Sequence, residues 1–242
     1  MILEQRGSHL RLGLIALWGI LSCFVVDPCC GAQEKDNSEM QRVLTQMDSV
    51  GKNFQSFTAK FTQKKYTAIL KEFDTPDTGE FYYSRAKDGS ALLRQEAAST
   101  GRKILTVKGG EAIFYQPDIK QARIANLGQY KNLAEFLALG IGQSPAKLQE
   151  NFDISYQGNE SINGAACSIL LLKPKAANIA SRFSSITLWV KRSNGLPIQN
   201  KLLEPSGDYV LLTFIDEKLN VKLSDATFEQ KLPRGVDIQR IQ

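Results

Sequence analysis

The chain has 242 residues, of which 43% are hydrophobic and 23% charged, and its formal net charge at pH 7 is +5. This length accommodates one large all-β domain or two small domains. The basic residues are scattered, without a cluster or an interleaved aromatic motif, which argues against a nucleic-acid-binding protein. A weakly basic surface suits an anionic membrane or an acidic partner, although ordinary solvation explains it equally well.

The first residues have the pattern of a secretory signal peptide. Two arginines precede an apolar run at 12–26, and the small residues Cys30 and Ala32 follow at the spacing that signal peptidases prefer. The apolar run is shorter than the roughly 20 residues of a permanent transmembrane helix. We therefore expect residues 1–32 to be cleaved and residues 33–242 to form one exported domain.

A second interpretation of the leader is a membrane tether. Residues 20–23 resemble a lipobox in which Cys23 would carry lipid. The apolar residues 24–26 argue against it, because they prolong the apolar run beyond the proposed cut. If the leader is removed after Ala32, Cys167 is the only cysteine left, so no internal disulfide forms, and its apolar surroundings indicate a buried thiol.

The exported domain is expected to open with one amphipathic helix and then to change to strand periodicity. Residues 33–39 read as a polar, mobile start with Ser38 as a helix cap. Gly51 is typical of a helix end, and from Phe54 the apolar period becomes two, which predicts a strand. The apolar residues at helical spacing before Gly51 are Met40, Val43, Leu44, Met47 and Val50.

Turn residues then recur at short intervals along the chain, with β-rich runs between them. Short strands at this spacing indicate an antiparallel sheet that curls toward a barrel or sandwich, and no pattern suggests parallel strands joined by helices. The runs predict strands at 80–84, 91–95, 103–108, 112–115, 122–125, 167–173, 183–191, 197–203 and 209–215.

One apolar helical segment interrupts the strands. Residues 130–139 are helical in pattern and strongly apolar, Gly140 and Gly142 end the helix, and Ser144-Pro145 starts a second short helix. A helix with so many apolar side chains cannot lie bare in water. We therefore expect this segment to cover the open side of the sheet or to plug its mouth, as a lid does.

The sequence lacks the residues of common catalytic and metal sites. The only histidine, His9, lies in the leader, which excludes histidine-dependent triads and histidine-containing zinc sites from the exported domain. Ser144 and Lys147 match an S-x-x-K fragment, but the accompanying motifs are out of order and lack the asparagine. We therefore predict a protein with no enzymatic activity, no metal and no other cofactor.

Several short motifs follow one another along nearly the whole exported domain. They are 56–63 (SFTAKFTQ), 79–85 (GEFYYSR), 110–117 (GEAIFYQP) with Gln121, 171–175 (LLKPK), and Phe228 with 232–236 (LPRGV). Each motif is loose alone, but in this order they resemble the periplasmic outer-membrane lipoprotein carrier family. One departure is Ala86, which replaces the proline that usually follows Arg85 in the family.

The resemblance implies a mainly β fold, an unclosed antiparallel β-barrel of about eleven strands with an α-helical lid. It implies a monomeric periplasmic carrier that takes lipoproteins by their acyl chains from an inner-membrane lipoprotein-releasing transporter to an outer-membrane receptor. It also implies that Arg85 hydrogen-bonds backbone carbonyls of the lid and keeps the empty carrier closed. The alternatives are a membrane-tethered lipoprotein receptor, which acylation of Cys23 would indicate, and a lipid-sensing or signalling domain on the same scaffold.

The candidates for lining an acyl-chain cavity are apolar residues at alternating strand positions and on the lid. An ordinary core uses the same alternation, so the pattern alone does not separate cavity from core. The candidates are Phe57, Phe61, Phe81, Tyr83, Ile113, Tyr115, Leu188 and Val190 on the strands, and Leu133, Phe136 and Leu137 on the lid.

Overall fold

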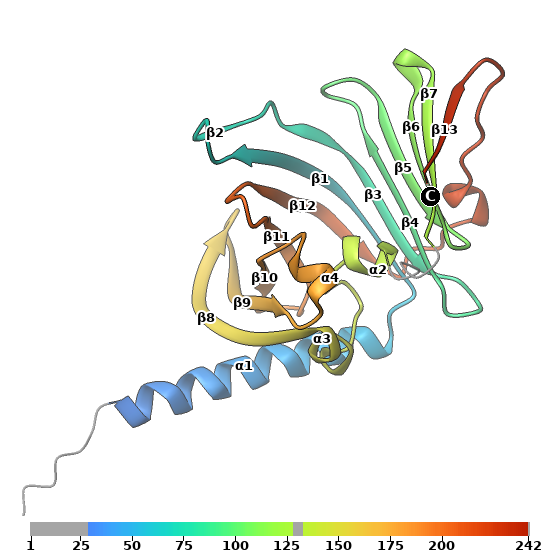
Figure 1. Ribbon diagram of the computed structural model, residues 1–242. Coiled ribbons are helices and arrows are strands. Elements are labelled where there is room, and N and C mark those ends of the chain that lie inside the picture. Colours follow the sequence, from blue (N-terminus) through green and yellow to red (C-terminus); the bar gives the residue numbers. More distant parts are fainter. Residues whose placement is uncertain (1–28, 128–132, 242) are drawn as a thin grey trace, which may run out of the picture.

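The computed structural model describes residues 29–127 and 133–241, in which one large curved sheet carries its helices on one side (Figure 1). The helices are α1 (Cys29–Lys52), α2 (Leu133–Leu137), α3 (Pro145–Asn151) and α4 (Ala177–Ala180), with two short 3-10 turns, η1 (Pro117–Ile119) and η3 (Asp225–Phe228). The strands are β1 (Ser56–Thr67), β2 (Glu72–Phe73), β3 (Asp77–Arg85), β4 (Ala91–Ala97), β5 (Lys103–Lys108), β6 (Glu111–Gln116), β7 (Gln121–Asn126), β8 (Phe152–Ile162), β9 (Ala165–Pro174), β10 (Ser185–Lys191), β11 (Pro197–Leu203), β12 (Tyr209–Leu219) and β13 (Asp237–Ile241).

The sheet is open, with β13 at one edge and β8 at the other. Its strand order is β13-β7-β6-β5-β4-β3-β1-β12-β11-β10-β9-β8, and β2 pairs with β1. Neighbouring strands are antiparallel except for β13, which runs parallel to β7. The predicted unclosed antiparallel barrel is therefore confirmed, and the described residues form thirteen strands in place of the expected eleven or so.

The start of the first helix differs from the sequence-based expectation. Helix α1 begins at Cys29, so residues 33–39 are helical and do not form a mobile start. The reason is that residues 32–50 contain neither glycine nor proline, and nothing local stops the helix from extending upstream. Residues 1–28 of the predicted signal peptide lie outside the described residues, and its cleavage stays a prediction.

Each strand places alternate side chains on the two faces of the sheet. We call the face that carries the helices the inner face and the other the outer face. Two apolar clusters fill the inner face, one over β1, β3, β4, β5 and β12 and one over β8 to β11. A smaller cluster of Ile104, Tyr115 and Ala122 lies on the outer face, where Leu232 and Val236 of the C-terminal segment pack on it.

Helix α1 packs on the inner face at the β8 end of the sheet. Its side chains Val43, Leu44 and Met47 are buried in one cluster with Leu170 and Leu188 of the strands, as their helical spacing predicted. In the described part of the chain, no helix combines the length and the hydropathy needed to cross a bilayer.

Candidate functional site

The segment between β7 and β8 is forced by topology to cross the sheet, and its described residues 133–151 pack on the inner face. Strand β7 lies next to one edge of the sheet and β8 forms the other edge, so the chain must pass across the curved sheet to join them. This crossing contains α2, a loop at 138–144 and α3, and we call residues 133–151 the lid. Figure 1 shows α2 and α3 on the helical side of the sheet.

The local sequence explains why the lid forms two short helices with a loop between them. Gly140 and Gly142 adopt φ angles of +81° and +62°, a region that residues with a Cβ seldom enter. Ser144 then caps α3 by accepting a hydrogen bond from the Lys147 N–H, and Pro145 occupies the first turn. The predicted start of the second helix at Ser144-Pro145 is therefore confirmed, whereas the first helix ends at Leu137, two residues earlier than expected, and residues 130–132 lie outside the described residues.

Beneath the lid lies a dense aromatic layer on β1 and β3. Phe57, Phe61, Phe81 and Tyr83 are each at most 1% exposed and belong to one cluster with the lid residues Leu137, Ala138 and Ile141. The Phe57 ring packs edge-on against Phe81 at a centroid distance of 6.1 Å. Sequence alternation placed these four strand residues together correctly.

The second half of the inner face is aliphatic. Leu188 and Val190 of β10 are fully buried in the cluster that also contains α1 and the lid residues Leu139 and Phe136. The Phe136 ring stacks on Phe183, which follows α4, at a centroid distance of 5.2 Å. Leu133 opens α2, and its side chain is outside the described part of the structure.

Two of the expected cavity residues do not belong to this site. Ile113 pairs with Thr106, and Tyr115 pairs with Ile104, so both side chains point to the outer face. Their neighbours Ala112 and Phe114 point inward instead. Ile113 and Tyr115 therefore do not lie with the other strand candidates for a cavity lining.

The structure also adds inner-face residues that the sequence analysis did not single out. They are all apolar and all buried, and the strand alternation of β4, β5 and β12 was the signal available for most of them. They are Phe54, Leu93, Val107, Ile141 and Phe214.

Arg85 connects β3 to the lid. One of its Nη atoms donates a hydrogen bond to the carbonyl oxygen of Gly142, and its guanidinium carbon lies 5.4 Å from the centroid of the Phe54 ring. A guanidinium presents several N–H donors in a plane, and it binds a carbonyl while it stacks on a ring. The side chain therefore contacts the lid loop and the inner-face cluster together.

A second strand also holds the lid by a polar contact. The buried Asn200 of β11 donates from Nδ2 to the Leu139 carbonyl at 3.3 Å. Within the lid, Gln143 donates to the Glu135 carbonyl at 2.6 Å, and the Glu135 carboxylate pairs with Lys147 at 2.6 Å. These bonds satisfy lid polar groups that would otherwise be buried against apolar side chains.

The Tyr83 side chain is buried, whereas the neighbouring Arg85 is exposed. Burial raises the pKa of the Tyr83 hydroxyl, the nearby Glu135 adds to this rise, and Arg85 opposes it. The hydroxyl therefore stays protonated at neutral pH. The members of both inner-face clusters have apolar or aromatic side chains, so this surface is suited to hold a hydrocarbon.

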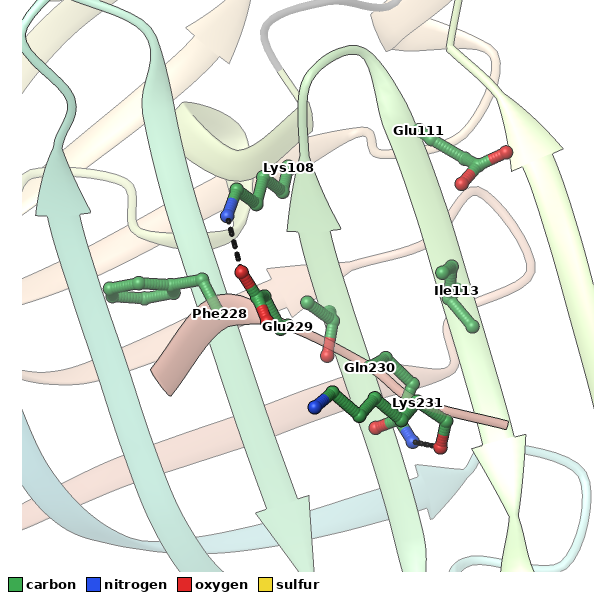
Figure 2. A pocket seen from close by; sticks show the side chains of 8 residues that line it. Lys108, Glu111, Ile113, Phe228, Glu229, Gln230 and Lys231 are labelled. Atoms are coloured by element: carbon green, nitrogen blue, oxygen red, sulfur yellow. Dashed lines mark hydrogen bonds and ion pairs between the residues drawn. The ribbon is translucent and has the colours of Figure 1, made fainter. Parts of the chain in front are cut away.

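Two open pockets lie on the outer face, between β4–β6 and the C-terminal segment. Their volumes are about 320 and 450 Å³. Figure 2 shows the first, in which Lys108 reaches Glu229 beside Ile113 and Phe228. Charged and amide side chains line much of both pockets, so they suit a hydrocarbon chain less well than the inner face does.

Comparison with known proteins agrees with the fold and with the chain-long pattern of motifs. Residues 52–231 match the family described as outer membrane lipoprotein carrier protein LolA. The chain is 29% identical over 192 residues to an outer-membrane lipoprotein carrier protein of Hahella chejuensis, which covers 78% of this chain and 84% of that protein. It is 24% identical over 205 residues to one of Azotobacter vinelandii, which covers 85% of this chain and 89% of that protein.

Among solved structures, an uncharacterized conserved protein from Thermus thermophilus has the same fold. Its TM-score is 0.52 at 13% sequence identity, and the match covers 84% of this chain and 99% of that one. Because the family match spans well over half of the sequence, this chain belongs to the outer membrane lipoprotein carrier family, LolA.

Proposed function

We propose that the protein is a non-enzymatic periplasmic carrier that holds the acyl chains of lipoproteins between the inner face and the lid. The observation that carries this proposal is an inner face filled by two apolar clusters and covered by a lid that a few polar contacts hold in place. Burial of hydrocarbon stabilises a complex by about 0.8 kcal/mol per methylene, so part of one acyl chain is enough for binding.

The same proposal defines the path of the cargo. Removal of residues 1–32 would leave a monomeric domain, residues 33–242, in the periplasm. This domain would receive lipoproteins from an inner-membrane releasing transporter and pass them to an outer-membrane receptor. Mass spectrometry of protein from the native envelope tests this part: a mature chain that starts near Gln33 supports it, and a lipid on Cys23 would indicate a membrane-tethered receptor instead.

Binding of acyl chains is tested with the exported domain alone. A fluorescent fatty acyl probe is expected to bind saturably, to be displaced by a purified lipoprotein, and to be insensitive to chelators and nucleotides. As a matched control, Phe81→Asp places a charge in the inner-face cluster, whereas Ile113→Asp places one on the outer face. The carrier proposal fails if the probe does not bind saturably, or if the folded Phe81→Asp protein binds it as well as the wild type does.

The proposal assigns Arg85 the role of a latch. Leucine at this position removes the hydrogen bond to the Gly142 carbonyl, so Arg85→Leu is expected to favour the open lid, raise apparent acyl affinity several-fold and slow transfer to receptor-bearing membranes. Arg85→Lys keeps one cationic donor and is expected to restore part of the wild-type behaviour. Equal uptake and equal transfer by wild-type and Arg85→Leu proteins would show that Arg85 is not the latch.

A further inference from the structure

The hairpin that joins β1 to β2 exposes two neighbouring large apolar side chains at its tip. Ile69 is 89% exposed and Leu70 is 63% exposed. Isolated apolar side chains are common on protein surfaces, but an adjacent pair at a projecting turn contributes nothing to the core and costs solubility. Figure 1 shows this hairpin projecting at the end of β1, beyond the body of the sheet.

The tip is an ordered turn. The Lys71 N–H donates to the Thr67 carbonyl at 2.8 Å and closes the turn. The Ala68 N–H donates to Asp208 Oδ1, also at 2.8 Å, which ties the tip to the turn between β11 and β12. The two apolar side chains are therefore displayed on a fixed backbone, and little ordering entropy remains to oppose their insertion into another phase.

Directly below the tip lies an aromatic collar, formed by Tyr66, Phe73 and Tyr209. The Tyr66 and Tyr209 rings stack at a centroid distance of 4.8 Å, and Phe73 packs edge-on against both, at 5.2 and 5.7 Å. Two lysines flank the collar: Lys201 Nζ lies 4.1 Å from the centroid of Tyr209, and Lys64 Nζ lies 5.9 Å from that of Phe73.

This layering of apolar tip, aromatic collar and lysines matches the layers of a lipid bilayer. Aliphatic side chains favour the acyl region, aromatic rings favour the boundary with the headgroups, and lysines favour anionic headgroups. We propose that the β1–β2 tip is a membrane-docking element that inserts Ile69 and Leu70 into the surface of a bilayer containing anionic lipid. This inference does not depend on the carriage of acyl chains.

A second copy of the chain is a poorer occupant for this surface. A stable protein interface buries roughly 800 Å² on each partner, which two side chains at a narrow tip do not supply. A bilayer needs no complementary shape, and a few apolar residues together with nearby positive charge are enough for reversible binding. The geometry of the tip therefore favours lipid.

The experiment measures partition of the exported domain onto vesicles by sedimentation. Vesicles of phosphatidylethanolamine with phosphatidylglycerol are expected to bind the wild-type protein, and phosphatidylcholine vesicles to bind it more weakly. The variant Ile69→Ser/Leu70→Ser is expected to lower the partition coefficient at least about tenfold, because two inserted side chains are lost. Lys64→Gln/Lys201→Gln, which removes the two lysines that flank the collar, is expected to lower it by about tenfold and to flatten its salt dependence.

A matched control is Ile215→Ser, which removes an isoleucine that is 44% exposed on β12, in the body of the sheet. It is expected to bind vesicles as the wild type does, and all variants are expected to unfold at the wild-type temperature. The proposal is overturned if the wild type does not bind anionic vesicles, or if the double serine variant binds them equally well. It is also overturned if the wild type forms a concentration-dependent dimer and the only effect of the double serine substitution is to abolish that dimer.

A direct reporter places a tryptophan at the tip. In Leu70→Trp, the emission of the new indole is expected to shift to the blue on addition of anionic vesicles and to be quenched by brominated acyl chains. Trp189→Phe is included in the same protein to remove the tryptophan of β10. Vesicle binding without any change in this emission would place the contact elsewhere and contradict the proposal.

Discussion

Gly142 combines three constraints in one residue of the lid. Its φ of +62° lies in the left-handed region, its carbonyl accepts the Arg85 hydrogen bond, and the Phe54 ring covers its Cα so closely that an added Cβ would overlap the ring. The Arg85 guanidinium in turn stacks near Phe54. A change at this residue therefore acts on the Arg85 hydrogen bond and on the inner-face packing at the same time.

Gly142→Ala is expected to loosen the lid. Backbone strain at positive φ and displacement of Phe54 together should cost about 1–3 kcal/mol, concentrated in the loop at 138–144. Hydrogen exchange is the measurement: amides of the loop should exchange faster while those of β10 keep their protection. The control Gly89→Ala has φ of +81° with no atom near the added Cβ, so it isolates backbone strain. Equal loop protection in both variants would contradict this account.

The residue scale also shows what alternation does and does not reveal. Phe57, Phe61 and Tyr83 were assigned to the inner face correctly, because β1 and β3 carry apolar side chains on that face and polar ones on the other. Strand β6 has apolar side chains on both faces. Its period of two therefore shows that Ile113 and Tyr115 share a face, but it does not show which face of the sheet that is. Which of the two faces carries Ile113 and Tyr115 depends on the C-terminal segment that covers it, more than a hundred residues further along the chain.

At the scale of elements, the C-terminal segment covers the apolar side chains on the outer face of β5 and β6. Residues 224–236 cross this face, Phe228 is 2% exposed, and Arg94 ties the crossing down by donating to the Glu229 carbonyl and to Gln230 Oε1, each at 3.3 Å. The closing strand β13 then pairs with β7 and covers that edge of the sheet.

Phe228→Ala is expected to destabilise the fold without changing the inner face. Loss of a buried phenylalanine side chain costs about 3–5 kcal/mol, which urea unfolding measures as a lower midpoint. Protein that remains folded should bind the acyl probe with wild-type affinity, because the lid and the inner-face clusters are on the other side of the sheet. Val221→Ala, at a residue 38% exposed, is the control and should unfold near the wild-type midpoint. Weakened probe binding in folded Phe228→Ala protein would contradict the separation of the two faces.

Strands β8 and β13 were not predicted from the sequence, because neither has a clear local pattern of buried and exposed residues. Strand β8 does alternate, with Phe152, Ile154 and Tyr156 facing inward, but a bulge after Tyr156 and polar residues beyond it hide the pattern. Strand β13 has no buried residue, and its position is fixed by pairing with β7. The lid, by contrast, was predictable because its apolar content, glycines and Ser-Pro start are local signals.

At the scale of the whole molecule, the described structure is a closed state. The inner-face side chains pack directly against Ala138 and Ile141 of the lid, and the same surface is the one proposed to hold acyl chains. Under this proposal, ligand and lid would compete for one set of side chains. The apparent affinity of such a carrier is its intrinsic affinity multiplied by the fraction of molecules that are open, which allows cargo to leave without an energy source.

This competition predicts a kinetic signature of acyl binding. If the lid must open before the probe enters, the observed rate of binding in stopped-flow fluorescence should rise with probe concentration and then reach a plateau equal to the opening rate. Arg85→Leu removes a bond that must break on opening, so it should raise the plateau several-fold, whereas Ile113→Asp on the outer face should leave it unchanged. A rate that stays linear in probe concentration and is the same in all three proteins would mean that the lid does not gate entry, and acyl chains would then have to reach the inner face by an opening that does not involve Gly142.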